Sequence, residues 1–432
     1  MATYKQGIVN VGDPGTAASG FHTRRLFNFS DRVAELAPDE SPFFVYLSKV
    51  AKVPTDDPQF RFLEDRTKIQ MTDRSFLING DVTIPAAGLS AVYNIDGATV
   101  DWLLKGMVVA VGQETAANAP NTVILRVESK PESGQLTMKT IAGSDGGVNI
   151  NDAKCTVIGT SFTEGSGGPD VFSQELDNDF GFTQIFKTAC EMSNTARATR
   201  YRGYADDFQR IWNLKLREHK VDIERAMLFG QRASVGGAQY TEGIAGHIIA
   251  NGTPSTENLD LTYSEGAPYF RSATTSELTY DRILSDFEVV YDPARGGSDS
   301  KLALASLPVI TYFNKMDSSF IDQSVTGQLR YNMEKATGSF GHTVLQVETI
   351  HGTMNLVKEP LFRGFASGFL CMVDMDNVAY RPLVGNGVNR DTQIMTNVQS
   401  ADEDLRKDMI LTEAGLEVSL PESHYLINLE GV

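Results

Sequence analysis

The feature that most constrains the fold is a long run of helical periodicity in the middle of the chain. Residues 206–231 read DDFQRIWNLKLREHKVDIERAMLFGQ. Apolar side chains recur there every three or four positions, which predicts an amphipathic α-helix that ends at Gly230. About 26 residues at 1.5 Å each give a helix of roughly 39 Å. A helix so much longer than average has to lie across a sheet or along a whole domain.

One stripe of this helix is predicted to be its buried core. The stripe comprises Phe208, Ile211, Trp212, Leu216, Ile223 and Met227. His219 falls on the same stripe, which favours a core or interface histidine over a metal ligand. Asp206 and Arg210 are spaced for an ion pair on the outer face, and Lys220 and Glu224 have the same spacing.

The charge of the chain limits the function classes open to it. The 432 residues hold 38 Lys and Arg against 55 Asp and Glu, a net charge of −17. Such a chain is a poor general binder of nucleic acid, because phosphate contacts need clustered Lys and Arg. Residues 197–232 carry nine basic and five acidic side chains, whereas residues 398–432 carry two and eight. This asymmetry either steers assembly between copies or has no function, and the charge run at 402–408 is interpreted as a solvated or subunit-contact surface.

Cysteine usage and hydropathy favour a protein of a reducing compartment. Cys155, Cys190 and Cys371 are odd in number, far apart and in no CxxC pair. This pattern argues against a disulfide framework and against a structural zinc site. The N-terminus shows no apolar signal segment, and no run of about 18 apolar residues could cross a membrane.

The order of the predicted elements indicates an α+β fold with an inserted all-β unit. Short segments rich in β-branched and aromatic residues run through residues 85–170 and predict a small sandwich or barrel. The Gly-rich stretch at 163–170 marks its exit. Further helices are predicted at 280–291 and after Ser306. Strands are predicted at 60–69, 181–193, 301–306, 343–350, 353–360 and 368–380, with two more in 415–429 around Pro421. Mixed strands and helices of this kind are typical of α+β proteins.

No catalytic, cofactor or metal site is predicted. The sequence has no phosphate-binding loop, no dinucleotide-binding glycine motif, no zinc-protease motif and no nucleophile elbow. Asp374 and Asp376 alternate on a predicted strand, so they could bind a cation or act as acid and base. The alternative, which we favour, is a turn at DMDN with Asp as an ordinary turn residue. The oxygen-rich segment 144–154 lacks the fixed spacing of a calcium loop.

The long helix and its flanks resemble a passage of tailed-bacteriophage major capsid proteins. Segment 182–230 runs from a strand reading TQIF-K into a helix that closes in a K-DIE-A-L-G pattern. The matching residues are Thr183, Gln184, Ile185, Phe186, Lys187, Lys220, Asp222, Ile223, Glu224, Ala226, Leu228 and Gly230. SPFF at 41–44 resembles the step from arm to loop in that family, and segments 301–316, 355–383 and 415–429 resemble its later strands and helix.

The resemblance implies the Hong Kong 97-type capsid fold, in which a long spine helix packs on a sheet. In the simple form of that family the extended loop is a plain hairpin, so the β unit here would be an insertion on it. The implied division is an N-terminal arm at 1–55, an extended loop at 56–84 and 171–195, an inserted β domain at 85–170, a peripheral domain at 196–295 with the spine helix at 204–230, an axial domain at 296–400, and C-terminal strands at 401–432 returning to the peripheral domain.

The resemblance also implies a function: a structural head protein, not an enzyme, of a tailed double-stranded DNA bacteriophage. Its copies would self-assemble into hexamers and pentamers of an icosahedral shell, in the virion capsid, after synthesis in the bacterial host cytoplasm. Other implied partners are scaffolding, portal and decoration proteins and packaged duplex DNA without sequence reading, with no membrane. No covalent cross-link is expected, because Lys68, Lys105, Lys130 and Lys139 match no cross-linking site.

Three alternatives stay open at this point. The first is a bacterial encapsulating-shell protein of the same fold, which would enclose protein cargo. The second is a carboxylate-based hydrolase around Asp374 and Asp376. The third is a secreted adhesin or carbohydrate-binding protein built on residues 85–170, against which the missing secretion signal counts.

Overall fold

The structure is a computed structural model, and it describes most of the chain. The described residues are 43–44, 47, 52–65, 74–95, 102–112, 122–131, 134–143, 146, 148–171, 175–200, 206–252, 254–255, 269–292, 297–313, 315, 333–337 and 343–431. Most of the N-terminal arm expected at 1–55 therefore lies outside the described residues, as does Lys68.

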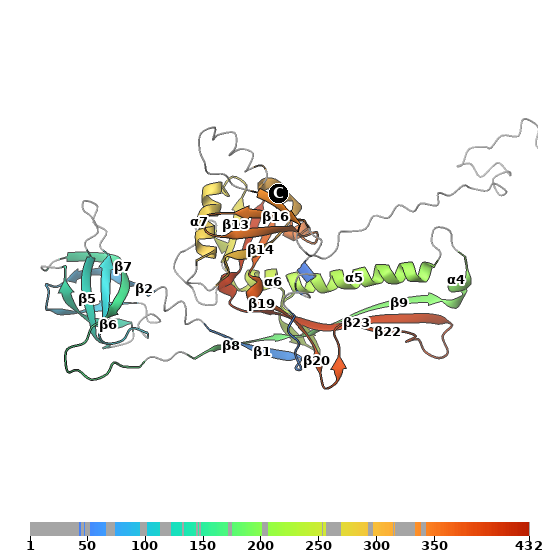
Figure 1. Ribbon diagram of the computed structural model, residues 1–432, viewed down its shortest axis with the longest axis horizontal. Helices are drawn as coiled ribbons and strands as arrows, with labels where there is room; N and C mark the ends of the chain where they lie inside the picture. The colour runs from blue at the N-terminus through green and yellow to red at the C-terminus, as the bar shows by residue number, and fades with distance from the viewer. Residues whose placement is uncertain are drawn as a thin grey trace, which may run out of the picture.

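A long helix lies along a four-stranded sheet, as the helical periodicity predicts (Figure 1). Helix α5 spans Asp207–Phe229. The sheet, called the spine sheet below, consists of β9 (Gln184–Ser193), β19 (Val378–Pro382), β22 (Gln393–Met395) and β23 (Leu405–Val418). Strand β23 is central, because it pairs antiparallel with the other three. The helix begins where the Asp206 carboxylate accepts a hydrogen bond from the Gln209 backbone N–H at 3.2 Å.

Glycines allow helix α6 (Ile244–Asn251) to pack closely against the end of α5. A Cβ atom on Gly246 would lie 2.2 Å from the carbonyl oxygen of Gly230, and one on Gly243 would lie 2.6 Å from the Gly230 nitrogen. Gly230 itself caps α5 with a φ of −59°, so its backbone is not left-handed. Glycine is required at this contact because backbone atoms would meet any side chain, and not because of an unusual dihedral angle.

We expect Gly246→Ala to destabilise the fold although the residue lies in a helix. Alanine is favoured over glycine in helices by about 1 kcal/mol. The added methyl group, however, would overlap the Gly230 carbonyl oxygen, and forced shifts of that kind cost roughly 1–3 kcal/mol. Thermal unfolding followed by circular dichroism should therefore show a lower Tm. Gly167→Ala is the matched control, because a Cβ there meets nothing within 4 Å; a Tm of Gly246→Ala at or above the parent value would contradict the packing.

The second sheet has eight strands, and its central strands β14 (Ser300–Ala305) and β18 (Phe369–Val373) are buried on both faces. In sheet order, the strands are β12 (Pro254–Ser255), β13 (Tyr269–Thr274), β24 (Tyr425–Glu430), β18, β14, β17 (Thr353–Lys358), β16 (Thr343–Glu348) and β15 (Met333–Thr337). In β14, Leu302 and Leu304 face a cluster shared with α5 and α6. Ala303 and Ala305 face a second cluster with helix α7 (Tyr280–Val290). Burial on both faces explains the unbroken apolar runs LALA and FLCMV.

Residues 75–160 form a six-stranded barrel with its own core. In sheet order, the strands are β2 (Ser75–Ile84), β7 (Val148–Thr160), β4 (Met107–Gly112), β5 (Thr122–Ser129), β6 (Gln135–Ala142) and β3 (Ser90–Asn94). A bridge between Ile78 and Ile95 brings the two ends of this order together, so the sheet closes. Its hydrophobic cluster is made of barrel side chains. The expected all-β unit is present, but it begins at 75 rather than 85 because β2 pairs with β7.

An antiparallel ribbon leads from the spine sheet toward the barrel (Figure 1). It is made of β1 (Gln59–Glu64) and β8 (Asp177–Phe182). The ring of Phe60 fills the space over Gly181 and Gly415, where added Cβ atoms would lie 2.4 and 2.8 Å from it. Further elements are α4 (Asn194–Ala198), the hairpin of β10 (Ala233–Val235) and β11 (Ala238–Tyr240), the hairpin of β20 (Val384–Gly385) and β21 (Val388–Asn389), and a helical stretch at 307–313 after Ser306, as expected.

The structure corrects three expected assignments. Strand β13, expected in the unit 196–295, belongs to the eight-stranded sheet, and helix α7 from the same unit packs on that sheet. The strand expected at 368–380 is two strands in different sheets, because a 3₁₀ turn at Met375–Asn377 separates β18 from β19. Of the C-terminal strands in 401–432, β23 joins the spine sheet but β24 joins the eight-stranded sheet. Within the described ranges, no helix is both long and apolar enough to span a membrane.

Candidate functional site

The predicted core stripe of α5 divides into two groups. Ile223 and Met227 are fully buried, whereas Phe208, Ile211, Trp212 and Leu216 are half-buried. The helix is therefore packed deeply only toward its C-terminal end. His219 is buried, as expected, with its ring nitrogens 2.9 Å from the hydroxyl oxygens of Thr188 and Thr412. Burial lowers the pKa of His219, which favours the neutral ring in this position.

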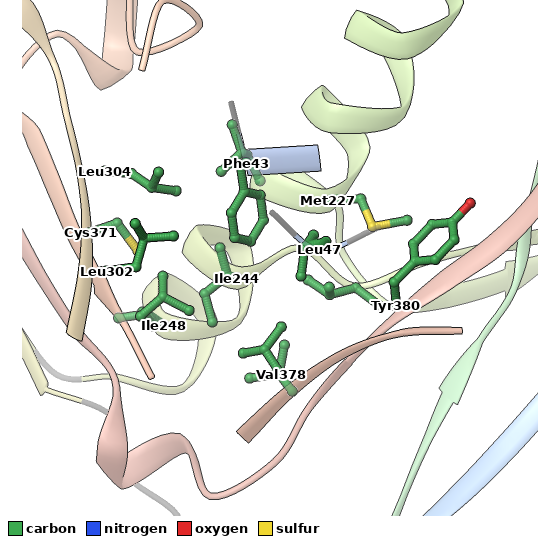
Figure 2. Close-up of a cluster of buried hydrophobic side chains, with 14 of the residues drawn as sticks. Phe43, Leu47, Met227, Ile244, Ile248, Leu302, Leu304, Cys371, Val378 and Tyr380 are labelled. Atoms are coloured by element: carbon green, nitrogen blue, oxygen red, sulfur yellow. The ribbon is translucent and has the colours of Figure 1, made fainter. Parts of the chain in front are cut away.

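The deeply packed end of α5 meets both sheets in one apolar cluster, called the junction core below (Figure 2). Phe43 and Leu47 of the N-terminal segment lie inside it and are fully buried. The side chains around them come from α5, α6 and strands of both sheets: Met227, Ile244, Ile248, Leu302, Leu304, Cys371, Val378 and Tyr380. The N-terminal segment thus joins parts of the chain that lie far apart in the sequence.

Two buried carboxyl groups lie beside the junction core. Glu224 on α5 accepts a hydrogen bond from the Phe43 backbone N–H at 2.8 Å, and Glu359 accepts one from the Leu361 N–H at 3.1 Å. The Oε2 atom of each carboxyl is buried and has no donor among the described residues. A proton shared between the two carboxyls would satisfy both atoms. Burial, and then the neighbouring carboxylate, raises the pKa of Glu224 to about 10, and burial raises the pKa of Glu359 to about 7.

These contacts correct the ion pairs expected on the outer face of the helix. Glu224 is buried while Lys220 is exposed, so the two do not pair. Arg210 pairs with Asp207 at 2.7 Å, because Asp206 is used as the N-cap. Charged residues in a helical pattern are usually exposed, although Glu224 lies three residues before Met227 and four before Leu228, which are both buried.

We expect the stability of the folded chain to fall as the pH rises above 4.5, the ordinary pKa of Glu. Both carboxyls bind protons more tightly in the folded than in the unfolded chain, where the pKa of Glu is 4.5. Their contribution is therefore fully present below that value and is lost as the pH rises through about 7 and then about 10. Each proton lost changes the free energy of unfolding by up to about 1.4 kcal/mol per pH unit.

The test is the Tm of the parent and of Glu359→Gln measured from acidic to alkaline pH. Glutamine keeps the shape and supplies an N–H donor to Glu224, so the Tm of this variant should depend less on pH. Glu218→Gln on the exposed face of α5 is the matched control and should follow the parent. Parallel pH profiles for the parent and Glu359→Gln would contradict the shared proton.

A second buried polar cluster lies between β14 and β18. The Lys301 ammonium donates to the carbonyl oxygen of Ser423 at 2.8 Å and lies 3.6 Å from the Asp374 carboxylate. The Asp374 N–H donates to Nδ1 of His424 at 3.2 Å. Burial lowers the pKa of Lys301, and burial followed by Lys301 lowers the pKa of His424 to about 3. Burial opposes the ionisation of Asp374, but Lys301 and backbone N–H groups hold its pKa below the ordinary value.

The two aspartates considered as a carboxylate site do not act together. Asp374 is buried, caps the 3₁₀ turn and pairs with Lys301, whereas Asp376 is exposed. The interpretation of DMDN as a turn is confirmed. Over the described ranges, no group of three His, Cys, Asp or Glu could hold a metal ion. Segment 144–154 contributes mainly to strand β7, while residues 144, 145 and 147 lie outside the described residues.

A third buried polar cluster, which contains an ion pair, was not predicted from the sequence. Arg271 on β13 and Asp286 on α7 are fully buried and joined by two hydrogen bonds. The hydroxyl of Tyr425 donates to the same carboxylate at 2.6 Å. One signal could have revealed Asp286: it lies three residues after Ile283 and four before Val290, on the apolar stripe of α7.

The sequence of the chain is similar to those of known capsid proteins. A family model described as SU10 major capsid protein matches residues 9–430 of the chain. A major capsid protein of Pseudomonas phage PaMx41 is 30% identical over 153 residues. That match covers 35% of this chain and 34% of the relative, so it spans about a third of the relative's length.

Two solved capsid structures align with almost the whole chain at low sequence identity. The capsid asymmetric unit of Cyanophage A-1(L) aligns with a TM-score of 0.49 and 10% identity, over 94% of this chain and 97% of that one. The capsid of an empty GTA particle aligns with a TM-score of 0.44 and 9% identity, over 94% and 95% of the two chains.

Proposed function

The chain belongs to the SU10 major capsid protein family, and from that premise we propose that it builds the head shell of a tailed bacteriophage with a double-stranded DNA genome. The observation that carries the proposal is the family match from residue 9 to residue 430. Many copies self-assemble into hexamers and pentamers of an icosahedral shell that encloses the genome. Subunits of such a shell need contacts that close under symmetry.

The distribution of burial supports a structural role for the helix. The N-terminal half of α5 packs only partly, and Leu214 on its outer side is 47% exposed. The ribbon of β1 and β8 likewise leaves apolar surface uncovered, because Leu63 is 64% exposed. Obligate assemblies bury roughly 2,000–5,000 Å² per interface. Long, partly covered elements of this kind offer the area that neighbouring copies need.

The positions of the buried and paired charged side chains argue for a non-enzymatic protein. The carboxylates that a hydrolase would have used are separated, one exposed and one paired with Lys301. Other buried titratable groups, such as Glu224 and Arg271, are held by hydrogen bonds inside the fold. These contacts use the charged side chains for structure and leave them no access to a substrate.

We assign the barrel to contacts on the outside of the shell. Its outward-facing side chains include the exposed apolar residues Leu77, Val92 and Ile158. These exposed apolar side chains are available for contact with a neighbouring subunit. A density map with the barrel on the inner surface would contradict this placement.

The remaining partners follow from the charge and the fold family. A net charge of −17 per copy limits sticking of DNA to the wall, so DNA is held as cargo without sequence reading. Scaffolding, portal and decoration proteins are the other partners, with assembly in the bacterial host cytoplasm and a final place in the virion capsid.

The test is negative-stain electron microscopy of the purified full chain with mass photometry. Closed shells, capsomer rings or tubes are the expected result. A single species at the monomer mass of 47.2 kDa under every salt condition, with and without co-expressed head proteins, would contradict the proposal. Shells that hold protein instead of DNA when isolated from the host would favour an encapsulating shell.

A further inference from the structure

The N-terminal segment is attached to the rest of the chain at two places that differ in chemistry. The first is the junction core, where Phe43 and Leu47 are fully buried and the Phe43 N–H donates to the Glu224 carboxyl at 2.8 Å (Figure 2). The second is at residues 52–55, whose backbone lies parallel to β19 and donates two N–H···O hydrogen bonds of 2.9 Å. The second attachment is made by backbone groups, whereas the first ends on a buried carboxyl group.

The carboxyl group that receives the segment has a second carboxyl group beside it. Glu224 is 0% exposed, and its neighbour Glu359 is 1% exposed. The Oε1 atom of each already accepts a backbone N–H, and the Oε2 atom of each has no donor among the described residues. A proton held between the two carboxyls satisfies both Oε2 atoms. Without that proton, two like charges would repel each other in an apolar surrounding.

No cation compensates this pair. In the part of the chain that the structure describes, neither carboxyl forms an ion pair. The charged groups on the surrounding elements have other partners or are exposed: His247 on α6 pairs with Glu242, Lys301 on β14 with Asp374, Arg381 on β19 with Glu417 and Arg390 with Glu413 on β23, while Lys220 and Arg225 on α5 and Lys358 on β17 are exposed. The proton is therefore the group that keeps the two carboxyls together.

We propose that the carboxyl pair is a proton latch for the N-terminal segment: the segment stays in the junction core while a proton bridges Glu224 and Glu359, and it leaves when the pair is deprotonated. The attachment at residues 52–55 does not involve the pair, so it remains and residue 52 becomes the hinge. The inference concerns a single copy of the chain and does not rest on the proposed function.

The N-terminal segment is the cover over the pair that can leave with the least disturbance. The other covering elements are held by sheet hydrogen bonds or, in the case of α6, by close backbone contact with Gly230. The described part of the segment is held here by the side chains of Phe43, Phe44 and Leu47 and by its hydrogen bonding to Glu224. Elements with few buried contacts open before the rest of a fold does.

The linkage between protons and docking fixes the direction of the pH effect. Burial raises the pKa of Glu224 to about 10 and that of Glu359 to about 7, whereas the ordinary value for Glu is 4.5. The docked state therefore holds protons that the released state gives up, so docking weakens as the pH rises above 4.5. Between about 7 and 10 one proton is involved, and the docking equilibrium should change by up to about tenfold per pH unit.

Cys371 is a natural probe of release, because its thiol is fully buried in the same cluster as Phe43 (Figure 2). The full chain is treated with N-ethylmaleimide from about pH 7 to about pH 8.5, and labelling of each cysteine is followed by mass spectrometry. Cys190 in the spine sheet and Cys155 in the barrel are buried references in the same molecule. The ratio of the Cys371 rate to the Cys190 rate should rise by about tenfold per pH unit.

Glutamine variants test whether the pair causes this rise. Glu224→Gln with Glu359→Gln keeps both shapes, supplies an N–H donor between them and has no proton to lose, so its ratio should not change with pH. Glu359→Gln alone should show a smaller slope than the parent, and it serves as the test if the double variant does not fold. Glu218→Gln, on the exposed face of α5, is the matched control and should follow the parent.

Leu47→Ala separates the apolar hold from the latch. It weakens docking without altering the carboxyls, so the ratio should be higher at every pH while its slope with pH stays that of the parent.

Two results would overturn the inference. A ratio that is constant with pH in the parent means that the segment stays docked or that the whole fold opens together. Equal slopes for the parent and both glutamine variants mean that other groups drive the release. Neither result depends on particle formation, so neither bears on the proposed function.

Discussion

Asp286→Ala should lower the free energy of unfolding by roughly 3–5 kcal/mol, because it breaks a buried ion pair from one side. Arg271 would keep its charge in a position with no solvent exposure, and the Tyr425 hydroxyl would lose its acceptor. Arg271 and Tyr425 lie on the paired strands β13 and β24 of the eight-stranded sheet, so the substitution would destabilise that sheet. Chemical unfolding by circular dichroism gives the free energy, and we expect a Tm lower by roughly 10 °C.

The position of the charge, and not its identity, is responsible for this effect. Asp281→Ala removes the same side chain from an exposed place on the same helix and should change the free energy by less than about 1 kcal/mol. Replacing both partners, by Arg271→Met with Asp286→Leu, should recover much of the loss, since no unpaired charge remains. An Asp286→Ala protein as stable as Asp281→Ala would contradict the buried pair.

Phe43→Ala should produce a loss of similar size in the junction core. Truncation of a fully buried phenylalanine typically costs about 3–5 kcal/mol, and Phe43 is 0% exposed. The cavity would lie between α5, α6 and both sheets, so these elements cannot all close in on it (Figure 2). A lower Tm and faster amide exchange at the C-terminal end of α5 are the expected measurements.

A matched aromatic control is available close by. Phe365 is 73% exposed and touches the rings of Phe229 and Phe369 only from outside. Phe365→Ala should therefore cost about 1 kcal/mol or less. If Phe43→Ala and Phe365→Ala lowered the Tm equally, the N-terminal segment would not be the element that joins the two sheets.

Elements with strong local signals were predictable from the sequence. The spine helix, expected at 204–230, runs from Asp207 to Phe229 because its cap and its period are both encoded nearby. Helix α7 follows its apolar stripe in the same way. The all-β character of residues 85–170 was also expected, but β2 was not, because its partner β7 lies more than sixty residues away. No turn or glycine-rich stretch in the sequence indicates that the chain enters the barrel at β2.

Assignments that depend on distant partners failed more often. Strands β18 and β19 are separated by one short turn, yet they belong to different sheets. The same holds for β23 and β24. Hydrophobic alternation predicts that a segment is a strand, but both sheets bury apolar faces, so it does not say which sheet the strand joins.

The sequence alone determined the class of the fold, the length and caps of its long helix, and the family resemblance, because these depend on residues within a few turns of one another. Only the tertiary structure decided which charges are buried and which stay open. Glu224 meets the Phe43 N–H across 181 residues, and Asp286 meets Tyr425 across 139. A charged side chain is buried only where such a distant partner satisfies it.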